Sequence, residues 1–115
     1  MNENCSPHTR QKEIFSQFTE LVEKHYKKER ELTFYAEKMF ITPKHLSQAI
    51  KEFTNRNALN IIEEYVISEA KSMLLSTAMS IQQISDELNF SSQSVFGKYF
   101  RRVTGTSPSD YRKGV

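Results

Sequence analysis

The chain has 115 residues, of which 26% are charged and 37% hydrophobic, with a formal net charge of +2. These values are ordinary for one small soluble domain or two closely joined subdomains. No apolar run approaches the roughly 18 residues of a membrane span, so we expect no membrane partner. The single cysteine, Cys5, has no second cysteine to pair with. This fits a reducing compartment, and we expect a cytoplasmic protein.

The sequence offers little for catalysis or for holding a cofactor. His8, His25 and His45 lack metal-ligand spacing with Cys5. Only three glycines are present, and they form no glycine-rich phosphate loop. We therefore expect a protein that is not an enzyme and that needs no cofactor or metal.

Apolar residues recur at helical spacing, and no stretch alternates for long with the period of two that marks a strand. Taken in chain order, the predicted helices cover residues 9–28, 32–40, 42–53, 58–76, 80–88, about 92–104, and a last one from 107. This pattern predicts an all-α fold with about seven helices.

Start and stop signals support several of these boundaries. Thr42 followed by proline is a typical helix start, and so is Ser107 followed by proline. Ser80 with a glutamine three residues later forms a capping-box pattern. We expect Thr33 to cap the second helix, and Asn89 to take the left-handed position after the fifth.

An internal repeat organises the chain. Ala36–Leu46 and Ser85–Val95 each begin with a small residue in a short helix, cross a polar break, and reach an apolar residue in the next helix. This is the sequence shape of a helix-turn-helix, and the two copies lie about 49 residues apart. We therefore divide the chain into four parts: a disordered segment or linker remnant (1–8), an N-terminal helix plus first helix-turn-helix (9–57), a long linker helix (58–79), and a second helix-turn-helix with a C-terminal helix (80–115).

Basic residues gather in the two predicted units. Residues 38–56 contain four Lys or Arg against one acid, and residues 91–115 contain five against one. Most charge clusters are merely solvated surface. Two separate basic stretches are also what two anion-facing elements would show.

The sequence resembles the DNA-binding domain of the AraC/XylS family of bacterial transcription regulators over residues 32–113. The likeness rests on "FYAEKMFITPKHLSQAIKEFT" (34–54), "AKSMLLST" (70–77), "SIQQISDELNF" (80–90), "SSQSVFGKYFRRVTG" (91–105) and "SPSDYR" (107–112). It implies two helix-turn-helix units linked by a long helix, with both recognition helices entering successive major grooves. Asn55 and Asn89 stand where the family often has glycine, and Val66 stands where many members have arginine.

The recognition helices are expected at about 43–54 and 92–104. Gln93 and Lys98 suit base edges, because glutamine pairs with adenine and lysine reaches guanine acceptors. The resemblance places the base contacts at Lys44, Ser47, Gln48, Gln93, Ser94, Gly97 and Lys98. We expect phosphate contacts from the helix starts at Thr42 and Ser91, and from Lys51, Arg101 and Arg102. The alternative for each residue is plain solvent exposure.

The expected function is therefore sequence-specific binding of double-stranded DNA, with RNA polymerase as a further candidate partner and a monomeric state for this chain. The alternative is a helical adaptor that docks on polymerase or on a partner regulator, for which the apolar stripe of residues 14–26 is a candidate surface. Family members are usually about twice this length or more, so we expect a domain of a longer regulator. The sequence gives no operator, target gene, effector or sign of regulation.

Overall fold

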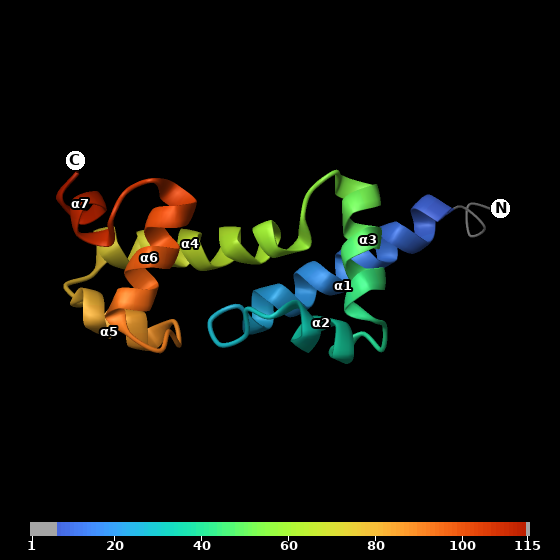
Figure 1. The fold of residues 1–115 in the computed structure, drawn as a ribbon, viewed down its shortest axis with the longest axis horizontal. Coiled ribbons are helices and arrows are strands. Elements are labelled where there is room, and N and C mark those ends of the chain that lie inside the picture. The colour runs from blue at the N-terminus through green and yellow to red at the C-terminus, as the bar shows by residue number, and fades with distance from the viewer. Residues whose placement is uncertain (1–6, 115) are drawn as a thin grey trace. The chain divides into compact units, whose positions relative to one another are not determined.

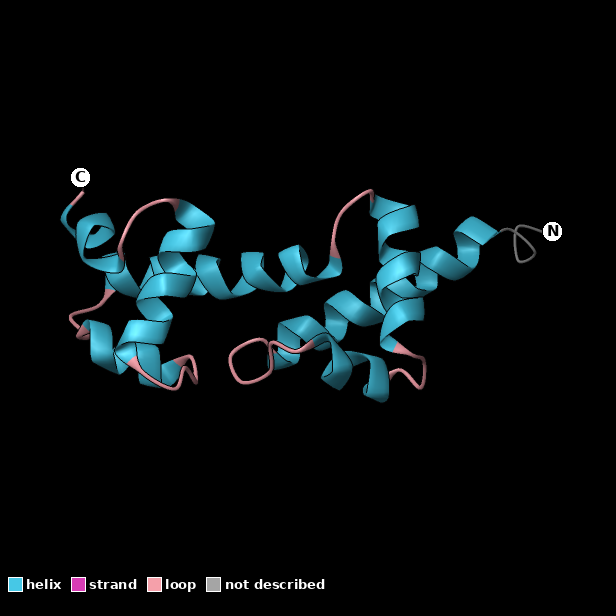
Figure 2. Cartoon of the chain, in the orientation of Figure 1, coloured by secondary structure: helices cyan, strands magenta, loops and turns pink. Residues whose placement is uncertain are grey.

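The computed structural model of the chain describes residues 7–114, and all regular structure in that range is helical (Figure 1, Figure 2). Its helices are α1 (Pro7–His25), α2 (Leu32–Lys38), α3 (Pro43–Thr54), α4 (Ala58–Ser76), α5 (Ile81–Glu87), α6 (Gln93–Thr104) and α7 (Pro108–Lys113). The prediction of an all-α fold with about seven helices is confirmed. Residues 1–6 of the expected linker remnant, including Cys5, lie outside the described residues, whereas Pro7 already begins α1.

Two compact units divide the chain within α4, the first ending at Ile62 and the second beginning at Glu63. The sequence-based division instead set residues 58–79 apart as a linker helix. Both ends of α4 contribute buried residues, with Ala58 in the first unit and Ala70 in the second. None of the described helices is both long enough and apolar enough to cross a membrane.

In the first unit, α1 packs against α2 and α3 around an apolar core. Ile14, Phe18 and Val22 of α1 are buried at the four-residue spacing that brings them onto one face. The hydroxyl of the fully buried Tyr35 donates a hydrogen bond to the carbonyl of Glu29 at 2.6 Å. Burial raises the pKa of the Tyr35 phenol, because the ionised form would lose its hydration.

In the second unit, the core centres on Phe96 and Phe100 of α6, which are both fully buried. Val95 and Val103 are apolar residues at the edges of the buried face of α6, and they are 45% and 36% exposed. Leu59, an apolar residue of α4, is 44% exposed. Helical spacing therefore identifies the residues at the centre of each apolar helix face, whereas apolar residues at the edges of the face are partly exposed to solvent.

Arg112 of α7 donates hydrogen bonds to carbonyls at the C-terminal end of α4. Its Nε donates to the carbonyl of Leu74 at 2.9 Å, and a terminal nitrogen donates to the carbonyls of Met73 at 3.5 Å and Thr77 at 3.3 Å. The last carbonyls of a helix lack intrahelical partners and carry partial negative charge. Arg112 thus stabilises the fold of the second unit, although it belongs to the basic stretch 91–115.

Candidate nucleic-acid interface

The first unit contains a helix-turn-helix formed by α2 and α3. After α2, the N–H of Ile41 donates to the carbonyl of Ala36 at 3.1 Å, and Phe40 between them is left-handed with φ of 60°. This bond satisfies a carbonyl that the helix end would otherwise leave open. Ala36 is fully buried where α2 packs against α3. A larger side chain at this position would hold the two helices apart. The chain begins α2 at Leu32 with Glu31 as its cap, so the predicted cap at Thr33 is wrong.

The same hydrogen bond and left-handed residue recur after α5 in the second unit. The N–H of Phe90 donates to the carbonyl of Ser85 at 3.0 Å, and Asn89 is left-handed with φ of 61°. The predicted left-handed role of Asn89 is confirmed, and so is the capping box at Ser80. Ser85 is fully buried, as Ala36 is in the first unit. The predicted offset of 49 residues therefore holds for the two short helices, α2 and α5, and for the left-handed residue that follows each of them.

Corresponding positions of the recognition helices α3 and α6 are instead offset by 50 residues. The hydroxyl of Thr42 accepts from the N–H of His45 at 3.0 Å at the start of α3. At the start of α6, Ser92 accepts from the N–H of Val95 at 3.1 Å. The predicted helix start at Ser91 is therefore wrong by one residue, because the second turn is one residue longer than the first.

This extra residue changes which side chains correspond in the two units. Leu46 corresponds to Phe96 and not to Val95, and both Leu46 and Phe96 are fully buried. The correspondence continues to the helix ends. There the hydroxyls of Thr54 and Thr104 each donate to the carbonyl four residues earlier, at 2.7 and 2.9 Å. The two units thus share a helix length, a cap at each end and a core position.

The residues of the second unit that are predicted to meet bases lie along α6. Gln93, Ser94 and Lys98 are exposed, and Arg101 is exposed in the last turn. Gly97 is half-buried, and a Cβ built there would meet nothing within 4 Å. The row therefore offers an amide, a hydroxyl and an ammonium group along the N-terminal half of the helix, followed by a guanidinium group.

The corresponding row of α3 is similar but carries an acid. Its exposed members are Thr42, Lys44, Gln48 and Lys51, with Ser47 half-buried. Glu52 is also exposed, at the position that corresponds to Arg102 in α6. The first unit therefore presents less positive charge along its recognition helix than the second unit does.

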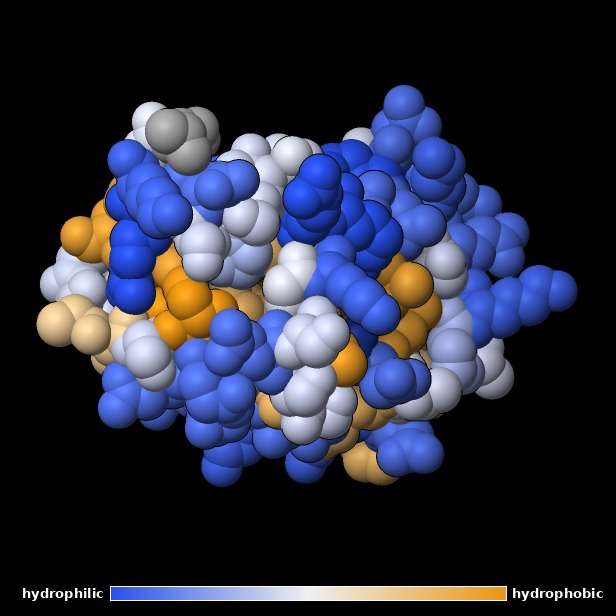
Figure 3. Space-filling view, turned by 60° about the vertical axis from the view of Figure 1, so that its left-hand side comes forward, coloured by the Kyte–Doolittle hydropathy of each residue, from blue (hydrophilic) through white to orange (hydrophobic). Residues whose placement is uncertain are grey.

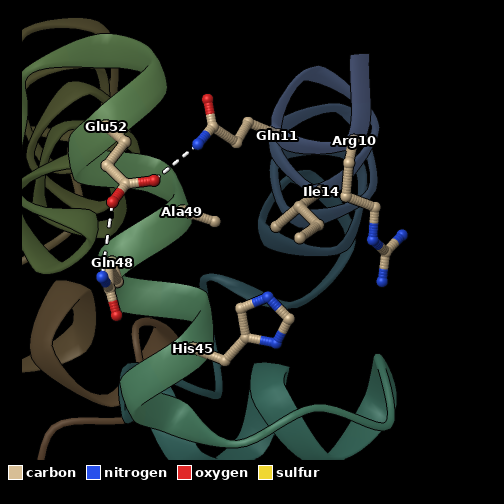
Figure 4. Close-up of a pocket in the computed structure, with 7 residues that line it drawn as sticks. All are labelled: Arg10, Gln11, Ile14, His45, Gln48, Ala49 and Glu52. Carbon is tan, nitrogen blue, oxygen red and sulfur yellow. Dashed lines mark hydrogen bonds between the residues drawn. The ribbon is translucent and has the colours of Figure 1, made fainter. Parts of the chain in front are cut away.

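Glu52 joins the recognition helix to α1, as Figure 4 shows. Its Oε2 accepts from the amide Nε2 of Gln48 at 3.3 Å, and its Oε1 accepts a short hydrogen bond from Nε2 of Gln11. The three side chains line a pocket of about 300 Å³ between α1 and α3 that also includes His45. Sequence reasoning missed Gln11 and Glu52. The four-residue spacing of Gln48 and Glu52 is a recognisable signal on a helix. The 41-residue separation of Gln11 from Glu52 is not.

Arg102, a predicted phosphate contact, has partners inside the second unit. Its guanidinium forms an ion pair with Glu63 of α4 at 2.9 Å and lies over the ring of Tyr99, 5.2 Å from the ring centroid. The Arg102 side chain is still 59% exposed, so the ion pair contributes at most about 1 kcal/mol to stability. The phosphate contact of Arg102 stays a prediction, and the structure adds an intramolecular role.

Figure 3 shows a face on which hydrophilic side chains predominate, with hydrophobic ones in patches between them. Within residues 7–114, no group of three or more His, Cys, Asp or Glu could hold a metal ion.

Two helix-turn-helix units of this geometry define a helix-turn-helix DNA-binding domain. A family model described as a helix-turn-helix domain matches residues 35–114. The arabinose operon regulatory proteins of Salmonella typhimurium LT2 and Escherichia coli K12 are each 32% identical to the chain over 79 residues. That stretch is 69% of this chain but 28% and 27% of the two relatives, so the chain spans about a quarter of their length.

Solved structures share the fold. The C-terminal domain of AraT, a response regulator from Geobacillus stearothermophilus, superimposes with a TM-score of 0.76 at 23% identity, over 99% of this chain and 89% of that one. The DNA-binding domain of AdpA, solved in complex with a target DNA, gives a TM-score of 0.75 at 17% identity, over 86% and 89%. The chain belongs to the AraC/XylS family and is the DNA-binding domain of a transcription regulator.

Proposed function

We propose that the chain binds double-stranded DNA sequence-specifically by inserting α3 and α6 into successive major grooves. The observation that carries this proposal is the duplicated turn and cap, which gives each unit a recognition helix of the same length with an exposed polar row. A helix-turn-helix reads bases with the N-terminal half of its second helix. Because both units belong to one chain, a single copy is sufficient for both grooves, and we propose that it binds as a monomer.

The proposed base contacts lie in the first two turns of each recognition helix. Gln48 and Gln93 present amides that can pair with adenine, and Lys98 presents an ammonium group for guanine acceptors. The remaining proposed base contacts are Lys44, Ser47, Ser94 and Gly97.

The proposed phosphate contacts flank these rows. Lys51 and Arg101 lie one turn further along their helices, where cations position a protein on the DNA backbone. Thr42 is the N-cap of α3, and Ser91 lies one residue before Ser92, the N-cap of α6. The free N–H groups at such helix starts favour anions. Arg102 completes the set in this proposal. Contact with RNA polymerase and a cytoplasmic location, where the chromosome lies, also belong to the proposal.

The direct test is fluorescence anisotropy of a labelled random-sequence duplex at several salt concentrations. Each neutralised phosphate contributes about −0.9 to the slope of log K against log salt, so a few contacts from each unit predict about −3 to −7. Selection from random duplexes should then enrich one bipartite sequence. A flat salt response would overturn the proposal and favour the helical adaptor instead.

A further inference from the structure

The N-terminal helix α1 reaches the recognition helix of the first unit through a single carboxylate. Glu52 accepts hydrogen bonds from Gln48 on its own helix and from Gln11 on α1, one at each oxygen. Gln11 lies outside the stretch 35–114 that matches the helix-turn-helix family. The link is therefore a feature of this chain beyond the matched domain.

The chemistry of Glu52 settles which way the Gln48 amide points. The two ends of a glutamine amide have nearly the same shape, but one end donates and the other accepts. An ionised carboxylate only accepts, so the amide nitrogen must face Glu52 and the oxygen must face away. Gln11 holds the other carboxylate oxygen and thereby restrains the Glu52 side chain itself.

The oriented amide keeps one N–H and its oxygen for a ligand. Adenine presents the complementary pair in the major groove, since its N6 amino group donates and its N7 accepts. A carboxylate beside a DNA-facing row also repels phosphate, which lowers affinity for every sequence. Its position next to Gln48 is therefore better explained by orientation than by binding strength.

We propose that Glu52 and Gln11 are positioning residues that fix the Gln48 amide in the orientation that selects adenine. This inference rests on the proposed function. It assigns α1 a part in sequence preference, although α1 lies outside the helix-turn-helix.

The test compares base preferences of four variants by selection from a random duplex library. Gln48→Ala identifies the base position that Gln48 reads, where discrimination should fall by about 5- to 150-fold, the value of a bidentate pair. Gln11→Ala and Glu52→Gln should lower discrimination at that same position and leave the positions read by α6 unchanged. Gln17→Ala is the matched control, because Gln17 is an exposed glutamine on the same helix.

Glu52→Gln gives a second readout that a purely structural role would not produce. Removing the negative charge should tighten binding to a random-sequence duplex, while preference at the Gln48 position falls. Affinity and specificity should thus move in opposite directions.

Two outcomes would overturn the inference alone: wild-type preference at the Gln48 position in both Gln11→Ala and Glu52→Gln, or an equal loss at all positions. A wild-type chain without any sequence preference would instead overturn the proposed function, and this inference with it.

Discussion

The buried hydroxyl of Ser85 gives the sharpest stability prediction. Ser85 is fully buried in α5, and its Oγ has no hydrogen-bond partner. The corresponding residue of the first unit is Ala36, which is equally buried and has no hydroxyl. Leaving a buried donor and acceptor unpaired costs about 1–3 kcal/mol. Ser85→Ala should therefore raise the free energy of unfolding.

The helix propensity of alanine adds to this gain. Serine is up to about 0.7 kcal/mol less favourable than alanine inside a helix. Because measured contributions of single groups rarely sum fully, we expect a net gain of about 1–2 kcal/mol. For a small domain, each kcal/mol shifts Tm by about 4 °C or more. Urea denaturation followed by circular dichroism measures the first quantity, and calorimetry measures the second.

The reciprocal variant Ala36→Ser is the matched control. It places an unpaired hydroxyl at the same position of the first unit, so it should lose about 1–3 kcal/mol. A loss of stability in both variants would refute the reasoning. It would mean that Ser85 has a partner, or that these crossing positions resist any change.

Four further substitutions probe the interface and the core. Gly97→Ala should gain about 1 kcal/mol in stability, because open space surrounds the new Cβ, yet it should weaken specific DNA binding if the helix backbone closely approaches the bases. Tighter or unchanged specific binding would remove Gly97 from the interface. Arg101→Ala and Arg102→Ala should each weaken binding to all sequences and make the salt slope shallower by about one. Arg102→Ala should also lose up to about 1 kcal/mol of stability, because its ion pair with Glu63 is removed. An unchanged salt slope would mean that Arg102 forms this ion pair but does not contact phosphate. Burial raises the pKa of Tyr35 in the folded state, so the protonated phenol contributes to the free energy of unfolding. This contribution is fully present below about pH 10 and is lost as pH rises further. Tyr35→Phe should therefore flatten the decline of the free energy of unfolding at alkaline pH, measured by urea denaturation.

Local signals predicted the helix starts well. The caps at Thr42, Ser80 and Ser107 follow from side chains that accept hydrogen bonds from the N–H three residues later. These signals failed at α2, whose cap is Glu31 and not Thr33, and at α6, where two serines stand in succession. Ser91 and Ser92 have the same capping chemistry, so the local sequence does not distinguish them. With Ser92 as the cap, the buried Phe96 takes the place of the buried Leu46 in the first unit.

Contacts between distant residues were beyond sequence reasoning. Arg112 appeared as one cation in a basic stretch, yet it binds the end of a helix 38 residues away. Gln11 meets Glu52 across 41 residues. Neither contact has a local sequence signal, because each depends on how the helices pack.

The difference between the two recognition rows has a consequence for binding. Lys98 and Arg101 of α6 have no acid on their helix, whereas Lys51 of α3 stands beside Glu52. We therefore expect the second unit to supply the larger share of the salt-dependent affinity. The first unit should contribute relatively more through base preference.

Hydroxyl-radical footprinting on a selected duplex tests the central claim most directly. A single chain that places α3 and α6 in successive major grooves should protect two patches about ten base pairs apart, one helical turn. Lys98→Ala should weaken one patch, and Gln48→Ala should weaken the other. A single protected patch would contradict the account, because one of the two helix-turn-helix units would then not engage DNA.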